Sequence, residues 1–305
     1  MPLKGRNPLL IPVSLILTLM ISGCDKFEGD QTVPAYIQID TIGMETNYSV
    51  QGTANQKIVD AWVYVDDQYI GDFEMPQVFP VLYNGSHRLE IMPGIKLNGI
   101  STTRAPYPMF QPVTVSDFKL VEDSTTKINP ETTYYDNVVF IWMEDFEDPS
   151  LSIKRAPQSD TAMYRTQPEN APGIFMDENS KYSGIAYLTD ERKYVELQSD
   201  DGNGGGFVLN RGDYFFLELN FKTTVPVVVG MFIERYNIGI EKRSLIILNN
   251  NNTWNKIYVN FTPMVNETAD AINYKVYFEA EKTTSGGTET IMFDNLKLLS
   301  RPNAR

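Results

Sequence analysis

Hydrophobic and polar positions alternate along most of this chain in short runs, and no stretch after the first 23 residues repeats with the period of a helix. In the run AWVYV, for example, Ala61, Val63 and Val65 fall on one face, and Trp62 and Tyr64 fall on the other. Such period-two alternation is typical of half-buried β-strands. Tyr and Phe also favour strands, and the chain has 17 and 16 of them. We therefore predict an all-β fold.

The pattern divides the chain into two β domains. In residues 33–130, strand-like runs recur at about ten-residue spacing, which predicts a β-sandwich. Residues 131–137 are polar and rich in Thr, and we interpret them as a linker. About ten further runs in residues 138–301 predict a jelly roll of two packed sheets. Two of these runs, YFFLELNF and VPVVVGMF, are apolar on nearly both faces and are predicted to be central strands.

Residues 1–23 have a different pattern, typical of a targeting segment. Lys4 and Arg6 precede an uncharged apolar run, Leu9–Ile21. This run is shorter than the roughly 20 residues that a bilayer-spanning helix needs. A basic start, a short apolar run and small residues at its end are typical of a signal peptide.

The signal segment ends in ISGC, which contains Cys24, the only cysteine of the chain. This ending resembles the lipobox of bacterial lipoproteins. The resemblance implies cleavage before Cys24 and acylation of its sulfur, as with palmitate, and of its new amino group. Several acyl chains anchor a protein stably, and no cysteine would then remain for disulfides or thiol chemistry. The alternative is a free thiol in an uncleaved leader.

The acidic stretch that follows, residues 24–32, is interpreted as a tether. It resembles the export signals of surface lipoproteins of Bacteroidetes. The resemblance implies a lipid-anchored protein of the outer membrane, displayed on the cell surface. A location facing the periplasm is the alternative.

The charge and the reactive residues exclude several classes of function. The chain has 39 acidic and 26 basic residues, a net charge of −13, and binding of nucleic acid requires a basic surface instead. The only histidine, His87, falls in a predicted hairpin, so a Ser-His-Asp triad is not expected. No acidic residue falls in a recognisable glycosidase motif, although such enzymes need two carboxylates across a cleft. We therefore predict a protein that is not an enzyme.

In the first domain, VYVDDQYIGDF and FPVLYNGSHRLEIMPGI resemble PEGA-type and related Ig-like domains. Asp67 stands where the family's turn has glycine, and Pro93-Gly94 interrupts the last strand of the motif. The resemblance implies a small structural or binding module. His87 matches the histidine at the exit of the family's turn, which implies a structural role.

The stretch 98–112, NGISTTRAPYPMFQP, places large apolar groups among prolines. Prolines fix φ and remove backbone donors, so this stretch is predicted to be a stiff, extended loop. One interpretation is that its aromatic rings fold back onto the sandwich. The other is an exposed ledge on which Tyr107, Met109 and Phe110 bind a protein partner.

In the second domain, DFEDP, SGIAYL, WNKIYVNFTP and IMFDNLKL resemble the galactose-binding-like jelly roll of many carbohydrate-binding modules. In that family, acids on the first and last strands often hold a structural Ca²⁺. The matching positions are Glu147 and Asp294, with Asp145 as a further candidate ligand. Ca²⁺ takes six to eight oxygen ligands, which carboxylates and loop carbonyls supply. The alternative is that these acids cap strand ends or pair with Lys297 or Arg192.

Candidate sugar-binding residues are chosen by residue type, because aromatic rings stack on the apolar faces of sugars. They are Trp142, Tyr182, Tyr187 and Tyr236. The Gly-rich stretch SDDGNGGGF lacks the Lys-Ser/Thr of a P-loop and is predicted to be a flexible loop between strands. The Asn run in LNNNNTW is predicted to form a turn.

Two functions agree with these observations. The first is an accessory subunit that docks, by binding alone, on an outer-membrane protein complex. The alternative is a surface glycan-binding lipoprotein that uses its C-terminal jelly roll.

Overall fold

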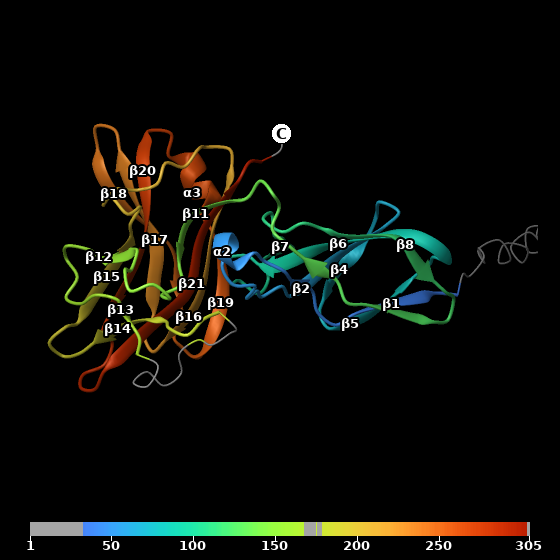
Figure 1. The fold of residues 1–305 in the computed structure, drawn as a ribbon, viewed down its shortest axis with the longest axis horizontal. Coiled ribbons are helices and arrows are strands. Elements are labelled where there is room, and N and C mark those ends of the chain that lie inside the picture. The colour runs from blue at the N-terminus through green and yellow to red at the C-terminus, as the bar shows by residue number, and fades with distance from the viewer. Residues whose placement is uncertain (1–32, 168–174, 176–178, 304–305) are drawn as a thin grey trace, which may run out of the picture.

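The computed structural model describes residues 33–167, 175 and 179–303. These residues form an all-β protein of two domains placed end to end along its long axis (Figure 1). The predicted signal peptide, Cys24 and the acidic tether lie outside the described residues. None of the described helices has the length and apolar character needed to cross a membrane.

The first domain is a sandwich of a five-stranded and a three-stranded sheet. In the first sheet the order is β4-β3-β6-β7, and β8 also pairs with β6. In the second the order is β5-β1-β9, and β1 and β9 run parallel. The strands of this domain are β1 (Ala35–Ile39), β3 (Asp60–Val65), β4 (Gln68–Glu74), β5 (Gln77–Val81), β6 (Gly85–Lys96), β7 (Arg104–Pro106), β8 (Val113–Leu120) and β9 (Thr125–Ile128). The predicted sandwich is confirmed.

Three short elements of the first half of the chain lie beside this sandwich. Strand β2 (Gly43–Met44) pairs in parallel with β10 (Glu131–Thr132). A short helix, α2 (Tyr48–Gln51), follows β2 and begins at the N-cap Asn47. Since β10 falls in the predicted linker, that segment is part of the folded structure rather than a free connection.

The second domain is a jelly roll of two sheets. The six-stranded sheet, here called the junction sheet, has the order β13-β14-β21-β16-β19, and β11 pairs with β21. The five-stranded sheet, here called the outer sheet, has the order β12-β15-β20-β17-β18. The elements are β11 (Val139–Glu144), β12 (Ile153–Arg155), β13 (Tyr164–Arg165), β14 (Gly184–Leu188), β15 (Tyr194–Ser199), β16 (Tyr214–Thr223), β17 (Val227–Arg235), β18 (Gly239–Leu248), β19 (Asn251–Asn260), α3 (Thr262–Glu267), β20 (Ala271–Glu281) and β21 (Glu289–Arg301).

Strand β16, the run YFFLELNF, is central in the junction sheet, as predicted. One face of β16 contributes Leu217 and Leu219 to the core between the two sheets. Its other face carries Phe216, which packs in the core of the first domain. The strand is buried on both faces because each domain covers one of them. The run VPVVVGMF, which leads into β17, is central in the same sense, since β17 lies between β20 and β18 as β16 lies between β21 and β19.

The Pro-rich stretch 98–112 lies at the contact between the domains. Tyr107, Met109 and Phe110 are only 2%, 0% and 2% exposed. The ring centroid of Tyr107 lies 5.1 Å from that of Phe216 and 4.7 Å from that of Tyr258, both in the junction sheet. An exposed ledge is therefore wrong, because these side chains gain more by burial between the two domains than they would on the surface.

A buried carboxylate joins the two domains at the same place. Glu218 on β16 is fully buried and accepts hydrogen bonds from the hydroxyls of Tyr107, at 2.9 Å, and Tyr134, at 3.1 Å. Lys256 on β19 pairs with it at 3.0 Å. Burial and the nearby charge of Glu218 hold the pKa of both tyrosines well above the ordinary value, so both hydroxyls remain donors.

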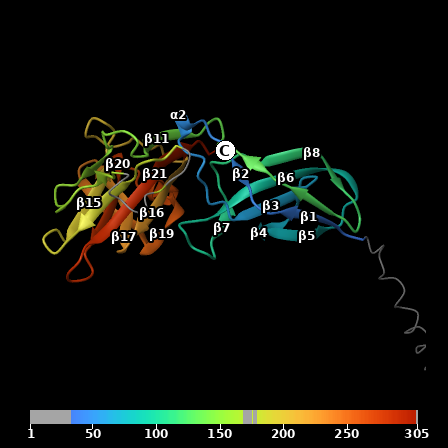
Figure 2. The same ribbon diagram turned by 60° about the horizontal axis from the view of Figure 1, so that its bottom comes forward.

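The junction sheet therefore faces the first domain, and the outer sheet faces away from it. In Figure 1, β1 lies at one end of the molecule, and β12, β15, β17 and β18 lie towards the other, as Figure 2 also shows for β15 and β17. Strand β1 follows directly on the segment that leads back to Cys24. The exposed face of the outer sheet is thus the part of the fold that is remote from the predicted anchor.

Candidate functional site

A cleft of about 560 Å³ lies on the exposed face of the outer sheet. We call it the outer-sheet cleft. Its floor is formed by side chains of β15, β20, β17 and β18, and its walls by the segments 156–158 and 204–206. The side chains that carry its chemistry are Gln158, Glu196, Gln198, Phe232, Glu234, Ile240, Lys242, Asn273 and Lys275.

Strand alternation and register bring these side chains together. On β15, Val195 and Leu197 point into the core, so Glu196 and Gln198 point into the cleft. Glu196 is paired across the strands with Glu279 of β20. On β17, Phe232 is flanked by Lys275 of β20 and Lys242 of β18. The cleft is therefore built from the β17–β18 hairpin together with β15 and β20, which lie apart from it along the chain.

Phe232 forms part of the floor and packs against the buried ring of Tyr277. The ring centroids of Phe232 and Tyr277 lie 4.9 Å apart, and the ammonium of Lys242 lies 4.9 Å from the Tyr277 centroid. Tyr277 is 1% exposed, whereas Phe232 is only partly buried and presents its ring to the cleft. Gly230 on β17 makes room for Tyr277, because a Cβ atom at this glycine would lie 2.7 Å from the Tyr277 ring.

A network of charges borders the aromatic pair. The ammonium of Lys242 lies 2.6 Å from Glu279 and 3.2 Å from Glu196. The hydroxyl of Tyr194 donates to Glu279 at 3.0 Å and to Glu196 at 3.2 Å. Burial alone would lower the pKa of Lys242, but its bonds to the two carboxylates outweigh burial and raise that pKa. Burial, and then the bond to Glu279, raises the pKa of Tyr194. The ammonium and the hydroxyl are thus held in their donor forms.

The Gly-rich loop 200–206 forms an ordered wall rather than a flexible connection. The Asp200 carboxylate accepts the backbone N–H groups of Gly202 and Gly204, at 3.1 and 2.8 Å. The Asp201 carboxylate accepts those of the residues two and four positions further on, at 2.9 and 2.8 Å. Lys275 donates to the Gly204 carbonyl at 2.7 Å and so attaches the loop to β20. The signal for this wall is the Asp-Asp pair before the glycines, since Asp side chains bond to the backbone two residues on.

The four aromatic residues chosen from the sequence do not share one surface. Trp142 is 5% exposed, and its indole N–H donates to Ser152 at 2.8 Å. The Tyr182 ring lies under the Arg165 guanidinium at 3.3 Å.

The other two aromatic candidates are exposed but lie on different sheets. Tyr187, 39% exposed, lies on β14 of the junction sheet. Tyr236, 68% exposed, lies in the turn between β17 and β18, two residues beyond Glu234 of the cleft. Phe232, Tyr194 and Tyr277 were not among the aromatic candidates chosen from the sequence. Alternation with acids and amides, as in Tyr194-Val-Glu-Leu-Gln, is the signal that marks such a face.

The predicted calcium ligands lie near one end of the jelly roll and are engaged by protein donors. Glu147 accepts the backbone N–H groups of Lys181 and Tyr182, at 2.6 and 2.9 Å. Asp294 is fully buried and accepts the Ser183 hydroxyl at 2.7 Å. Asp145 accepts the hydroxyl of Tyr48, from α2, at 2.9 Å.

The donor set was tested against the requirements of Ca²⁺. Burial raises the pKa of Asp294 to about 8, and the charge of Asp145 acts in the same direction. In the described part of the chain, no group of three or more His, Cys, Asp or Glu side chains is placed to hold a metal. The acids as arranged here therefore do not by themselves fit a calcium site. Calcium binding stays a prediction, which calorimetric titration with Ca²⁺ tests.

Comparison with protein-family models and with curated proteins gives no match. Solved structures with a similar fold include the C-terminal family 22 carbohydrate-binding module of Clostridium thermocellum Xyn10B, at 10% identity, covering 54% of this chain and 96% of that one, with a TM-score of 0.36. They also include carbohydrate-binding modules of the β-sandwich superfamily, at 14% identity, 78% and 84% coverage and a TM-score of 0.36.

A third similar structure is the enzymatically active domain of tailspike protein 4 of bacteriophage CBA120, at 13% identity and a TM-score of 0.33. The match covers 51% of this chain and only 20% of the tailspike. With TM-scores below 0.5, these likenesses carry no argument for this chain, and the β-sandwich is assigned from the strand pairing described above.

Proposed function

We propose that this chain is a non-catalytic glycan-binding protein whose outer-sheet cleft binds a neutral sugar chain. The observation that carries the proposal is the combination of an accessible aromatic ring with several hydrogen-bonding side chains in one cleft. A sugar ring has an apolar face of C–H groups and a rim of hydroxyls. Phe232 and Ile240 match the apolar face, and the negative face of an aromatic ring attracts C–H groups.

The polar side chains of the cleft suit hydroxyl groups. Amides such as those of Gln158, Gln198 and Asn273 both donate and accept, as hydroxyls do. The volume of about 560 Å³ is within the range of small-molecule sites. Two acidic side chains, Glu196 and Glu234, balance the two basic ones of the cleft lining, Lys242 and Lys275. The cleft therefore has no excess of positive charge, and this favours a neutral sugar over an acidic one.

Attachment to the envelope is the second part of the proposal. Acylation of Cys24 and display on the outer-membrane surface are supported by the sequence of the first 32 residues. The outer-sheet cleft is then the part of the molecule furthest from the lipid, where a polymer outside the cell reaches it. The other predicted function, docking on an outer-membrane protein complex, was based on an exposed apolar surface formed by Tyr107, Met109 and Phe110. These three side chains are buried between the domains and do not form such a surface.

A glycan array followed by calorimetric titration of the mature chain tests the proposal. Phe232→Ala is expected to weaken binding by about tenfold or more, which equals about 1.4 kcal/mol. Tyr187→Ala is the matched control, because it removes an exposed aromatic ring from the other sheet. The proposal fails if no glycan binds, or if the Phe232 variant binds like the wild type.

Recovery from membranes tests the docking function separately. Under mild detergent, the glycan-binding proposal expects the protein to be released without a stoichiometric partner. Recovery with an outer-membrane barrel protein at equal amounts, together with a blank glycan array, would favour the accessory subunit instead.

A further inference from the structure

A second cleft, of about 380 Å³, lies where the two domains meet, and we call it the junction cleft. It shares no residue with the outer-sheet cleft. Among the residues that the structure describes, its lining has no acidic side chain, although acidic residues outnumber basic ones by 39 to 26 in the chain. Instead it contains three lysines, Lys57, Lys96 and Lys256, and five asparagines, three of them in the run 249–251.

The walls of the junction cleft are fixed by direct bonds between the domains. The backbone N–H of Asn98 donates to the Tyr258 carbonyl at 2.9 Å, and its side chain accepts the Asn260 N–H at 2.7 Å. The Tyr258 hydroxyl in turn accepts the backbone N–H of Lys57 at 2.9 Å. These bonds hold the cleft in one shape before any ligand arrives, which lowers the entropy cost of binding.

The positive charges of the cleft are only partly balanced. Lys256 is paired with the buried Glu218 at 3.0 Å. The Lys57 ammonium donates to a neutral group, the Asn255 side chain. Lys96 lies 3.7 Å from Glu74, a carboxylate that also binds Arg104 at 2.8 Å.

The two less balanced lysines act on each other. Burial, and then the positive charge of Lys96, lowers the pKa of Lys57. An anion between the two ammonium groups would relieve this repulsion, since an opposite charge within about 4–6 Å favours the charged form.

We propose that the junction cleft binds an oxyanion carried on a sugar, with Lys57 and Lys96 pairing with the anionic group. The surrounding asparagine amides, of Asn98, Asn255 and residues 249–251, donate to and accept from the sugar hydroxyls. The volume is enough for a single substituted sugar, at the lower end of the range for ligand sites. The shared chemistry is a carboxylate, sulfate or phosphate on a pyranose ring. This site is independent of the neutral-glycan site proposed above.

Titration of the mature chain with four probes tests the inference: glucuronate, glucose 6-sulfate, glucose 6-phosphate and glucose. At least one charged probe is expected to bind, less tightly as salt rises because salt screens the ion pairs. Which charged probe binds best identifies the anionic group. Equal binding of glucose and of the charged probes would overturn the inference, and so would the absence of binding by any charged probe.

Two variants localise the binding. The double variant Lys57→Met with Lys96→Met is expected to weaken the binding of the charged probes by about tenfold or more, which is about 1.4 kcal/mol. Asn250→Asp keeps both lysines but adds a negative charge to the lining, so it too should weaken the binding of the charged probes. Lys119→Met, on the exposed face of β8, is the matched control and should change nothing.

The Phe232→Ala variant separates this inference from the proposed function. It should leave the binding of charged sugars unchanged while weakening neutral glycans. Charged probes that bind the Lys57 and Lys96 double variant like the wild type, or that lose binding in Phe232→Ala, would overturn the junction cleft as their site.

Discussion

Gly230 leaves the space in which the buried Tyr277 ring packs against Phe232 of the outer-sheet cleft. A Cβ atom at this position would lie 2.2 Å from the Arg243 carbonyl oxygen and 2.7 Å from the Tyr277 ring. The carbonyl belongs to the neighbouring strand β18 and cannot move without breaking the sheet. The residue type at 230 is thus set by packing and not by a turn.

Gly230→Ala is expected to lower the free energy of unfolding by about 1–3 kcal/mol, the usual cost of overpacking. It should also weaken glycan binding, because a displaced Tyr277 moves Lys242 from its carboxylate partners. Urea unfolding and calorimetric titration measure the two effects. Gly43→Ala, where the nearest atom is the flexible Glu131 side chain at 3.1 Å, is the control. A Gly230 variant as stable as the control would contradict this account.

His87 gives a prediction for pH. Its Nδ1 lies 2.7 Å from the Asp66 carboxylate, and this bond raises the pKa of His87 above 6.5. A folded pKa above the unfolded value means that the pair stabilises the domain fully below about pH 6.5. The contribution is then lost as the pH rises through the folded pKa. The pair is partly exposed, so we expect less than about 1 kcal/mol.

An NMR titration of the imidazole checks this directly, because the chain has no other histidine. His87→Gln should remove the corresponding loss of stability between about pH 5 and pH 9. An imidazole that titrates at or below 6.5 in the folded protein would refute the contact with Asp66 as the cause.

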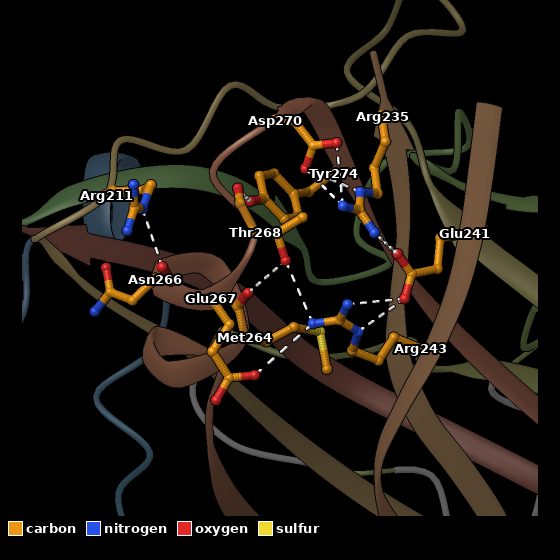
Figure 3. A network of polar contacts seen from close by, with 10 residues as sticks. All are labelled: Arg211, Arg235, Glu241, Arg243, Met264, Asn266, Glu267, Thr268, Asp270 and Tyr274. Carbon is orange, nitrogen blue, oxygen red and sulfur yellow. Dashed lines mark hydrogen bonds and ion pairs between the residues drawn. The ribbon is translucent and has the colours of Figure 1, made fainter. Parts of the chain in front are cut away.

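At the scale of elements, the edge strand β18 carries charged side chains that form a network of ion pairs. Figure 3 shows Arg235 and Glu241, from β17 and β18, among the polar residues beside α3. Arg235 donates to both oxygens of Asp270, at 3.0 and 3.1 Å, and to Glu241 at 2.7 Å. Arg243 donates to the same Glu241 at 2.8 Å. Inward-facing charges on an edge strand also disfavour pairing with a further chain.

Arg235→Met is expected to lower the free energy of unfolding only slightly, since the arginine binds two carboxylates but all three groups are accessible to solvent. The difference from the wild type should shrink at high salt, because screening weakens the original ion pairs. Thermal unfolding at low and high salt measures this. Arg192→Met, at an exposed position, is the control and should have no comparable effect.

The positions of the strands were more predictable from the sequence than the pairing of one strand with another. Alternation identified the run of β3, and a continuous apolar run identified β16. The Asp66-Asp67 turn is present, with both residues at positive φ, 48° and 64°. The cleft, however, needs β15, β20, β17 and β18 side by side, an order that does not follow the chain. Local patterns cannot specify such long-range pairing, so residues such as Tyr194 and Tyr277 could not be recognised as one site.

At the scale of the whole molecule, the contact between the domains is the feature least visible in the sequence. The Tyr107-Glu218 bond joins residues 111 positions apart, and the segment around Thr53 bonds to Asn295 at 2.8 Å, 242 positions away. The apolar character of the 98–112 stretch was recognised, but whether its rings faced solvent depended on a surface in the other domain. This surface forms only when the two domains meet, and the residue pattern within either domain does not encode that meeting.

Glu218→Ala is expected to destabilise the protein by about 3–5 kcal/mol, because it leaves the Lys256 ammonium buried without its partner. The wild type should unfold in one calorimetric transition, since the buried contact couples the domains. The variant should unfold in two. Glu218→Gln can still accept hydrogen bonds from Tyr107 and Tyr134, so its stability should lie between those of the wild type and of Glu218→Ala. Two transitions in the wild type would contradict the coupling.

The same contact has a mechanical consequence. A glycan held in the outer-sheet cleft and a tether leading from β1 would pull on opposite ends of the molecule, and that force would act on the domain contact as well as on the chain that joins the domains. Tension would load the Asn98-Tyr258 backbone bond, the Asn98-Asn260 bond and the Glu218 network together. Bonds that are loaded together share the force, so this arrangement resists rupture better than a flexible linker between two independent domains.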